Sequence, residues 1–467
     1  MNSRSLISIP WLLAFLLLGV IVSGFWISRA GAQEGSEAKP STETKGDSDG
    51  DAFSNRLTAM VGATIETVGK AGQIKNGTIL IRGSKIQAVG SDIEIPVNAW
   101  VIDVTGKTIL PGIVDPYFVV TAARSTVAPE SRTVTFGGRT FTIGGGAAPE
   151  STAFLRLADG FDVRTGPWSI AIRSGITTPH LVTSGFGQSI IAKTIPDHEE
   201  LILDQLDGTL FVAASTRTDS MNLLRSGLEE KSSSGNASGG DARARLAAMR
   251  GRSGGGRGGS DTTTSGAASP ASSDGQSEKK LSLSQQLWND VKAGKKTLFV
   301  NANSAAAIVH VLKIVDQAKK AKVVLIADGA DLFQAREAIK NSSVMVVLRP
   351  RLETVPNSAT RLNMAKELQN QKTNFSFSLS LNQADYSQSQ DTPLFPVSAL
   401  VHTGLSRTAA LESLTINPAK LLGMEKTIGS IEVDKQANLV IFDTDPLESV
   451  GRVQQVYVDG RPVYENQ

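Results

Sequence analysis

Apolar and polar residues alternate in short stretches near both ends of the chain. Residues 78–90 (TILIRGSKIQAVG) alternate on either side of a turn at Gly83-Ser84, and residues 99–110 (AWVIDVTGKTIL) repeat the pattern. The same alternation returns in residues 429–445 and 453–465. A period of two residues between tight turns predicts short antiparallel strands at both ends of the chain.

The middle of the chain has a different pattern, in which apolar runs of strand length are followed by helical periodicity. Residues 297–320 and residues 322–341 each predict one buried strand and one helix. Strands that alternate with helices of this length are typical of parallel β/α units. Further along, Ser406 is expected to cap one helix, and Asn417 is expected to cap a second helix that ends before Gly423.

The order of these patterns predicts the domain organisation. The two β-rich ends can pair with each other in space, because the termini of a folded domain often lie close together. We therefore predict a small β-sandwich built from residues 57–110 and 425–467, with an α/β region over residues 111–424 between them. Residues 231–280 interrupt that region with Ser- and Gly-rich sequence of low complexity, which predicts a disordered insertion.

The first residues have the sequence of a targeting segment. An apolar run over residues 6–27 precedes Ala30-Gly31-Ala32, a pattern that suits signal peptidase. The run is long for a signal and approaches the length that spans a bilayer, so residues 1–32 are predicted to be a signal peptide or a membrane anchor. Residues 33–56 are predicted to be a disordered tether. Both alternatives place the rest of the chain outside the cytoplasm, in a periplasmic or extracellular compartment, with a possible membrane tether through residues 6–27.

The composition excludes several classes of chemistry. The 467 residues include no cysteine and 4 histidines, and the formal net charge is +2. Without cysteine the chain has no disulfide, thiolate zinc site or cysteine nucleophile. The charge gives no general attraction to nucleic acid, so no nucleic-acid partner is expected. No two histidines have the spacing of a helical zinc motif, and the sequence has no G-x-S-x-G nucleophile elbow.

Several junction sequences resemble those of one known family. Residues 77–117, from GTILIRGSKIQAVG to GIVDPY, resemble the opening of the amidohydrolase superfamily. Residues 404–447 resemble its closing helices and strand, and residues 456–465 (VYVDGRPVYE) resemble its last hairpin. Residues 171–188 (AIRSGITTPHLVTSGFGQ) are similar to the imidazolonepropionase-like branch. The resemblance implies a TIM-like (β/α)8 barrel beside the β-sandwich, and a metal-dependent hydrolase of carbon–nitrogen bonds other than peptide bonds.

The resemblance also implies metal ligands at the carboxyl ends of the barrel strands, and three of those positions are changed. The family opens its barrel with D-x-H-x-H, whereas this chain has Asp115, Tyr117 and Val119 in that frame. Valine offers no lone pair, and tyrosine binds a metal well only after losing a proton with a pKa of about 10. Asn301 stands where a middle strand is expected to end in histidine, and an amide oxygen suits calcium better than zinc.

A few residues are weak candidates for an altered site. Asp115 and Asp385 are candidate catalytic carboxylates, and Asp115, His180 and Asp328 are candidate metal ligands. For His180 the alternative is a histidine whose hydrogen bonds are satisfied within the strands. Lys193 lies near the position where some family members carry a carboxylated lysine, and the alternative is an ordinary lysine. No cofactor is expected unless the protein is an active enzyme, which would need zinc or another divalent metal.

These observations leave two main hypotheses for function. The first is a non-catalytic homologue that keeps the barrel and sandwich as a scaffold, and that binds an unidentified small molecule or protein at the barrel mouth. The second is a hydrolase of carbon–nitrogen bonds, such as those of cyclic amides, with an altered metal site. A purely structural role, with a tether through residues 6–27 and a link through residues 231–280, is a third possibility.

Overall fold

The computed structural model describes residues 56–120, 132–136, 139–143, 154–161, 168–195, 203–205, 208–214, 218–229, 281–355, 357–380, 392–448 and 450–466. The predicted signal or anchor segment, the predicted tether up to residue 55, the 231–280 insertion and Asp385 lie outside the described residues. Within the described part, no helix is both long and apolar enough to cross a membrane.

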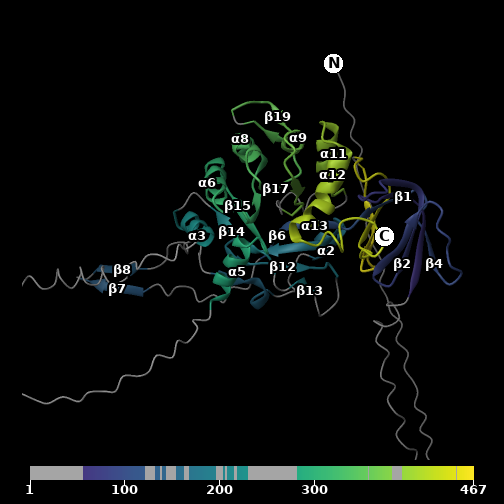
Figure 1. Cartoon of the computed structure of the whole chain (residues 1–467), viewed down its shortest axis with the longest axis horizontal. Coiled ribbons are helices and arrows are strands. Elements are labelled where there is room, and N and C mark those ends of the chain that lie inside the picture. The colour runs from purple at the N-terminus through teal and green to yellow at the C-terminus, as the bar shows by residue number, and fades with distance from the viewer. Residues whose placement is uncertain are drawn as a thin grey trace, which may run out of the picture. The chain divides into compact units, whose positions relative to one another are not determined.

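Strands from both ends of the chain form one eight-stranded sheet, seen in Figure 1 as purple strands beside the yellow C-terminal segment. The order along the sheet is β23-β22-β21-β5-β1-β2-β3, and β4 also pairs with β1. The strands are β1 (Leu57–Glu66), β2 (Gln73–Arg82), β3 (Lys85–Gly90), β4 (Trp100–Asp103), β5 (Thr108–Pro111), β21 (Leu439–Phe442), β22 (Val453–Val458) and β23 (Arg461–Glu465). Leu439 lies opposite Pro111 in an antiparallel register, so the pairing joins the two terminal segments that the alternation predicted to be strands.

Strand β1 pairs with two different strands along one edge. Thr58–Val61 run parallel to β4, and Thr64–Ile65 run parallel to β5. Gly62 lies between these two pairings with a φ of 85°, and a Cβ at this position would lie 2.2 Å from the side-chain oxygen of Thr105. Glycine alone tolerates both the left-handed conformation and the close approach, so Gly62 allows β1 to change partners within one strand.

The middle of the chain forms two further sheets. A four-stranded sheet has the order β13-β12-β10-β6, and a seven-stranded sheet has the order β20-β17-β16-β15-β14-β11-β9. The first contains β6 (Ile113–Val119), β10 (Ile176–Val182), β12 (Ile190–Ala192) and β13 (Leu203–Gln205). The second contains β9 (Phe154–Arg156), β11 (Phe186–Gln188), β14 (Leu210–Ala214), β15 (Thr297–Ala302), β16 (Lys322–Ile326), β17 (Met345–Leu348) and β20 (Phe375–Phe377). From β14 to β20 all neighbouring strands are parallel, in agreement with the predicted β/α units. Two small hairpins complete the strands, β7 (Arg132–Phe136) with β8 (Arg139–Ile143), and β18 (Glu353–Thr354) with β19 (Arg361–Leu362).

Helices follow the parallel strands, and several begin at the side-chain caps that their sequences favour. They are α2 (Trp168–Arg173), α3 (Thr218–Leu228), α5 (Leu283–Lys292), α6 (Ala305–Val315), α7 (Gly329–Gln334), α8 (Arg336–Lys340), α9 (Met364–Asn370), α11 (Phe395–His402), α12 (Arg407–Leu414) and α13 (Ile416–Leu422), with a 3-10 turn over Leu157–Asp159. Ser406 caps α12 as predicted, since its hydroxyl accepts from the backbone N–H of Ala409. The predicted cap at Asn417 is wrong, because α13 already begins at Ile416 and the Asn417 amide donates to the carbonyl of Phe375 instead.

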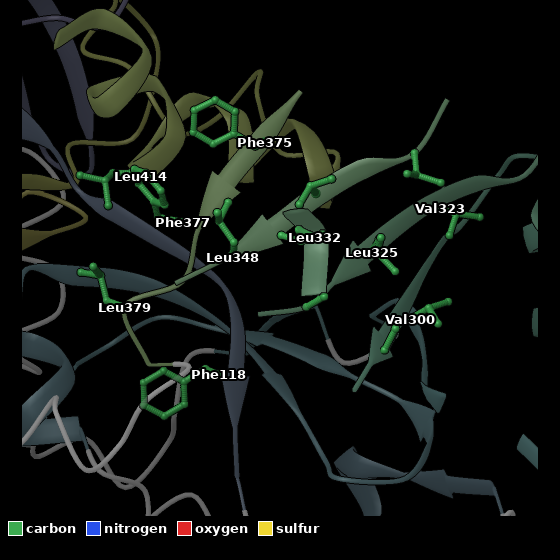
Figure 2. Close-up of a cluster of buried hydrophobic side chains, with 14 of the residues drawn as sticks. Phe118, Val300, Val323, Leu325, Leu332, Leu348, Phe375, Phe377, Leu379 and Leu414 are labelled. Atoms are coloured by element: carbon green, nitrogen blue, oxygen red, sulfur yellow. The ribbon is translucent and has the colours of Figure 1, made fainter. Parts of the chain in front are cut away.

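Each parallel strand is buried on both faces, which explains why its sequence is a continuous apolar run. On one face, a cluster that includes Val300, Leu325 and Leu348 packs against helices, and Figure 2 shows these side chains with Leu332 of α7. On the other face, alternate residues of the same strands form a second cluster with Tyr117 and α13. Its strand members include Phe211, Phe299, Val324, Ile326 and Val347.

In the described residues, the strands that were predicted to close an eight-stranded barrel form these two separate sheets, with no closed ladder between them. Side chains connect the sheets at β6 and β20. The carboxylate of Asp115 accepts a 2.9 Å hydrogen bond from the backbone N–H of Ser380, and the hydroxyls of Ser378 and Ser380 donate to the carbonyl of Tyr117 at 3.1 and 2.8 Å. In a closed barrel the first and last strands, β6 and β20, would have to pair. Hydrogen bonds of polar side chains connect β6 to the residues after β20 instead.

Candidate functional site

Asp115 is the one residue of the family's opening motif that this chain retains, and its carboxylate is fully buried. One oxygen accepts from the backbone N–H of Tyr117 at 3.0 Å, and the other accepts from the backbone N–H of Ser380 at 2.9 Å. Burial raises the pKa of Asp115, although these hydrogen bonds act in the opposite direction. Both oxygens are therefore committed to the backbone, and the environment disfavours the charged form that a metal would need.

Tyr117 and Val119 occupy the two positions of the missing histidine pair, and both pack into the cluster between the sheets. Tyr117 is almost completely buried, and its ring lies 5.8 Å from that of Phe211. Burial raises the pKa of Tyr117 to about 12, so the phenol keeps its proton at neutral pH. Val119 is partly buried and packs against the same cluster. An apolar ring and an apolar side chain thus fill the space of the first two ligands.

Asn301 lies beside Tyr117, as the position of both residues at strand ends would require. Its side-chain amide donates a 2.8 Å hydrogen bond to the Tyr117 hydroxyl. Two of the positions at which the sequence lacks the expected histidines are thus brought into direct contact. The contact couples β6 to β15 through a neutral hydrogen bond rather than through a shared ion.

His180 is fully buried in β10, with both ring nitrogens engaged. Nδ1 lies 2.7 Å from the carbonyl of Pro116, which can only accept, so Nδ1 carries the proton. Nε2 is then an acceptor, and it lies 2.7 Å from the Ser189 hydroxyl and 2.9 Å from the Thr209 hydroxyl. Burial lowers the pKa of His180 to about 4, so the ring is neutral at physiological pH.

The surroundings of His180 match the alternative in which its hydrogen bonds are satisfied within the strands. Ser189 and Thr209 are themselves buried and are hydrogen-bonded to each other. They connect β10 to the start of β14, and so they bridge the two sheets at a second place. Sequence reasoning did not identify these two hydroxyl residues, because single Ser and Thr residues have no sequence pattern that marks such a role.

Asp328 follows β16 and is half-exposed, but it is not free to bind a metal alone. Its carboxylate forms a salt bridge with the guanidinium of Arg349, which follows the neighbouring strand β17. Glu353, nearly buried, lies close by and pairs with Arg351 at 2.7 Å. Burial raises the pKa of Asp331, helped by the negative charges of Asp328 and Glu353. This polar corner is thus a mixture of carboxylates and guanidinium groups at the carboxyl ends of two parallel strands.

The alternation along the strands places Asn301, Asp328 and Arg349 on one side. Phe299, Val324, Ile326 and Val347 face the cluster between the sheets. The three polar residues continue these alternating positions, Asn301 near the end of β15 and Asp328 and Arg349 just beyond the ends of β16 and β17. Carboxyl ends of parallel strands are where α/β proteins bind ligands. Arg349 was overlooked in the sequence, although its place directly after the strand MVVL is a visible signal.

Lys193, the position that could carry a carboxylated lysine in the family, has a different partner. Its ammonium group forms a 2.7 Å salt bridge with Asp459, in the turn between β22 and β23. Both side chains are largely buried. Lys193 therefore connects the four-stranded sheet to the eight-stranded sheet rather than facing the strand ends.

The donor set does not fit the metal that the family implies. No group of three or more histidine and acidic residues with the geometry of a metal site occurs in the described residues. Asp115 is bonded to two backbone N–H groups, His180 has no free lone pair, and Asp328 is paired with an arginine. These three candidate ligands do not converge on a common point. Asp385, the fourth candidate, lies outside the described residues. The described residues that follow the last parallel strand, β20, include Ser378 and Ser380, which offer hydroxyl groups and no carboxylate.

Comparisons with known proteins agree on a family. Residues 291–463 match the sequence model of the amidohydrolase family. The N-acetylglucosamine-6-phosphate deacetylase of Rattus norvegicus is 41% identical over 63 residues, which are 14% of each chain. The imidazolonepropionase of Treponema denticola is 46% identical over 61 residues, which are 12% of this chain and 15% of the relative. The chain thus matches only short parts of its curated relatives, down to 7% for the amidohydrolase tasK of Hapsidospora irregularis.

A solved structure has a similar fold. The crystal structure of an amidohydrolase from Thermotoga maritima superimposes with a TM-score of 0.61, at 20% sequence identity, over 88% of this chain and all of that one. This likeness concerns the fold, whereas the matches to the family model and the curated relatives concern the sequence. The matches to the family model and to the curated relatives, together with the opening and closing motifs, support the amidohydrolase superfamily as the family of this chain.

Proposed function

We propose that this protein is a non-catalytic member of the superfamily that works outside the cytoplasm as a binding or scaffold protein. The observation that carries the proposal is the environment of Asp115. Its two carboxylate oxygens accept hydrogen bonds from the backbone N–H groups of Tyr117 and Ser380. The one residue that remains of the metal-binding motif therefore connects two backbone segments. The hydrogen bond between Tyr117 and Asn301 supports the same reading at the neighbouring positions. Export rests on the Ala30-Gly31-Ala32 pattern in the sequence.

We also infer that the two middle sheets are the parts of one distorted barrel. The parallel order from β14 to β20, and the parallel pair of β6 with β10, match the strand sequence of such a barrel. Ser378 and Ser380 bridge one gap through Asp115 and Tyr117, and the group around His180 bridges the other. In this arrangement the polar corner of Asp328 and Arg349 would lie at the barrel mouth, where a small polar molecule or a protein loop could bind.

Metal content and hydrolytic activity test the proposal directly. The purified full chain is incubated with zinc, dialysed and analysed by mass spectrometry for bound metal, and it is assayed on cyclic amides and dipeptides. We expect no stoichiometric metal and no hydrolysis above the rate without protein. Detection of one tightly bound transition metal per chain, together with hydrolysis, would sink the proposal in favour of a hydrolase with an altered metal site.

Two variants decide whether any bound metal is functional. Asp115→Asn keeps the shape of the side chain but replaces one of its two acceptor oxygens by an amide NH2, so its fold is checked by near-UV circular dichroism. Asp316→Asn removes a carboxylate that is exposed on the surface after α6. Loss of metal and activity in Asp115→Asn alone, with the near-UV circular dichroism unchanged, identifies Asp115 as a ligand and refutes the scaffold role. Equal metal content in both variants and the wild type indicates adsorption elsewhere on the surface.

A further inference from the structure

A group of apolar side chains is exposed at the edge of the eight-stranded sheet. Val97 is fully exposed, at 107%, and Trp100 and Val101 are 60% and 53% exposed. Ile95, at 37%, extends the group along the connection between β3 and β4. We refer to Ile95, Val97, Trp100 and Val101 as the edge patch. Large apolar side chains that are exposed together in one segment of a folded surface are candidates for contact with something other than water.

The strand pairing of β4 does not explain why these apolar residues are exposed. Within the described residues β4 pairs only with β1, and it does so through its four residues Trp100–Asp103. Successive side chains of a strand point to opposite faces, yet both Trp100 and Val101 are exposed. The strand therefore presents apolar groups on both sides of the sheet edge, where natural proteins usually place charge.

Cationic side chains surround the same end of the sheet. The guanidinium of Arg56 lies 4.9 Å from the centre of the Trp100 ring. Arg82 lies opposite Leu57 in the register of β1 and β2, and Lys85 lies opposite Arg82. All three cations are exposed.

Two of the neighbouring carboxylates, Asp92 and Asp103, are held by local hydrogen bonds. Asp103 bonds to Thr105 at 2.6 Å, and Asp92 bonds to Ser91 at 2.9 Å. A tryptophan flanked by arginine and lysine is the combination that suits the interface of a membrane, because the ring is amphipathic and the cations attract anionic headgroups.

We propose that the edge patch rests on the surface of a lipid bilayer, with Val97 and Trp100 in the interfacial layer and with Arg56, Arg82 and Lys85 against anionic headgroups. The proposal is independent of catalysis and of the scaffold role. Its geometry would orient the eight-stranded sheet toward the membrane. It applies whether the apolar run is retained or removed, because the patch supplies its own apolar and cationic groups.

The absence of cysteine allows a clean test. In the full chain, Val97→Cys creates a single thiol that is labelled with an environment-sensitive dye, and Val450→Cys serves as the matched control. Val450 is 63% exposed and lies in the connection between β21 and β22. That connection is tied by Arg407, which bonds both Glu66 and Asp445, to the opposite end of β1 from Trp100.

Vesicles of phosphatidylcholine with phosphatidylglycerol are added, and quenching by brominated acyl chains reports on contact with lipid. We expect a blue shift and quenching at position 97 and neither at position 450, with a weaker effect on pure phosphatidylcholine. Equal responses at the two positions, or no response at position 97, would overturn the proposal. A shift at position 97 that rises with protein concentration in the absence of vesicles would overturn it as well, and it would identify a second copy of the chain as the occupant.

A second pair of variants tests the role of the tryptophan. In the Val97→Cys background, Trp100→Ser is compared with Phe395→Ser, which removes an aromatic side chain that is 51% exposed at the start of α11. We expect Trp100→Ser to reduce lipid contact at position 97 about tenfold, because it removes most of the apolar area that enters the interface. Phe395→Ser should leave the signal unchanged. If the two substitutions have equal effects, the patch does not contact lipid in the proposed way.

Discussion

Acidification should destabilise this protein through one residue, His180. The folded state holds its imidazole neutral with a pKa of about 4, because the ring is buried, whereas the same group in the unfolded chain has a pKa of about 6.5. Between these two values the unfolded chain binds a proton that the folded protein does not bind. Stability from this residue is therefore fully present above about pH 6.5 and is lost as the pH falls toward about 4.

The structure sets the size of the effect. The difference between 6.5 and about 4 corresponds to about 3 kcal/mol of unfolding free energy, since each pKa unit is worth about 1.4 kcal/mol. The full value applies because His180 has no exposed surface. Protonation would give the ring a second N–H, at Nε2, and the Ser189 and Thr209 hydroxyls would have to reorient to accept a hydrogen bond from it. The charge would also lie against the Phe299 ring, whose centre is 4.5 Å away.

Urea unfolding of the wild type and of His180→Gln at a series of pH values measures this contribution. Glutamine stays neutral throughout, so the other titrating groups cancel in the difference between the two proteins. We expect the wild type to be more stable at about pH 7.5 and to lose about 3 kcal/mol relative to the variant by about pH 4. Two curves that stay parallel over this range would refute the neutral, buried histidine, and so would a wild type that gains stability relative to the variant on acidification.

Three substitutions test the contacts of Asp115 and Tyr117 and the ion pairs that connect α12 to the eight-stranded sheet. Asp115→Ala should lower the unfolding free energy by about 3 kcal/mol, because two buried backbone N–H groups lose their acceptor, and added zinc should not change the urea midpoint of either protein. Tyr117→Phe should cost about 1 kcal/mol in the same assay, since one buried hydrogen bond from Asn301 is lost, and a cost near zero would show that the amide finds another acceptor. Arg407→Met should cost about 2 kcal/mol by thermal unfolding, because Glu66 is left nearly buried without its cation, whereas the exposed Arg225→Met should be nearly neutral.

The strands were predictable from the sequence because their patterns are local. The alternation in residues 78–90 and 99–110 depends only on which face of one strand meets the core, and both stretches form strands in the eight-stranded sheet. The apolar runs before α6 and α7 were equally clear, because parallel strands buried on both faces carry a continuous apolar signal. Helix caps were harder to predict. Ser406 caps its helix as the local sequence pattern indicates, whereas the Asn417 side chain bonds to the carbonyl of Phe375, a contact that no local sequence pattern predicts.

The arrangement of the candidate site depended on contacts between distant segments, and these were not predictable. The positions of Tyr117 and Asn301 followed from the family frame, but their mutual hydrogen bond joins strands whose spacing in three dimensions the sequence does not state. The same holds for Lys193, whose partner Asp459 lies in the last hairpin. His180 was the histidine expected nearest the strand ends. Its partners Ser189 and Thr209 are ordinary residues, so only the fold reveals that the ring has no free nitrogen.

The retention of Asp115 without its histidines has a physical explanation in the fold itself. In the described residues β6 and β20 lie at the edges of different sheets, so no ladder of backbone hydrogen bonds joins them. Backbone N–H groups that are buried without an acceptor are costly. Asp115 accepts one such group from Ser380 and a second from Tyr117 of its own strand. A residue with that role is needed whether or not a metal is present. Replacing the neighbouring ligands by Tyr117, Val119 and Asn301 then costs little, because a ring, an apolar side chain and one internal hydrogen bond fill the same space. The contacts of Asp115 therefore give a structural reason for an aspartate at this position that does not depend on a metal.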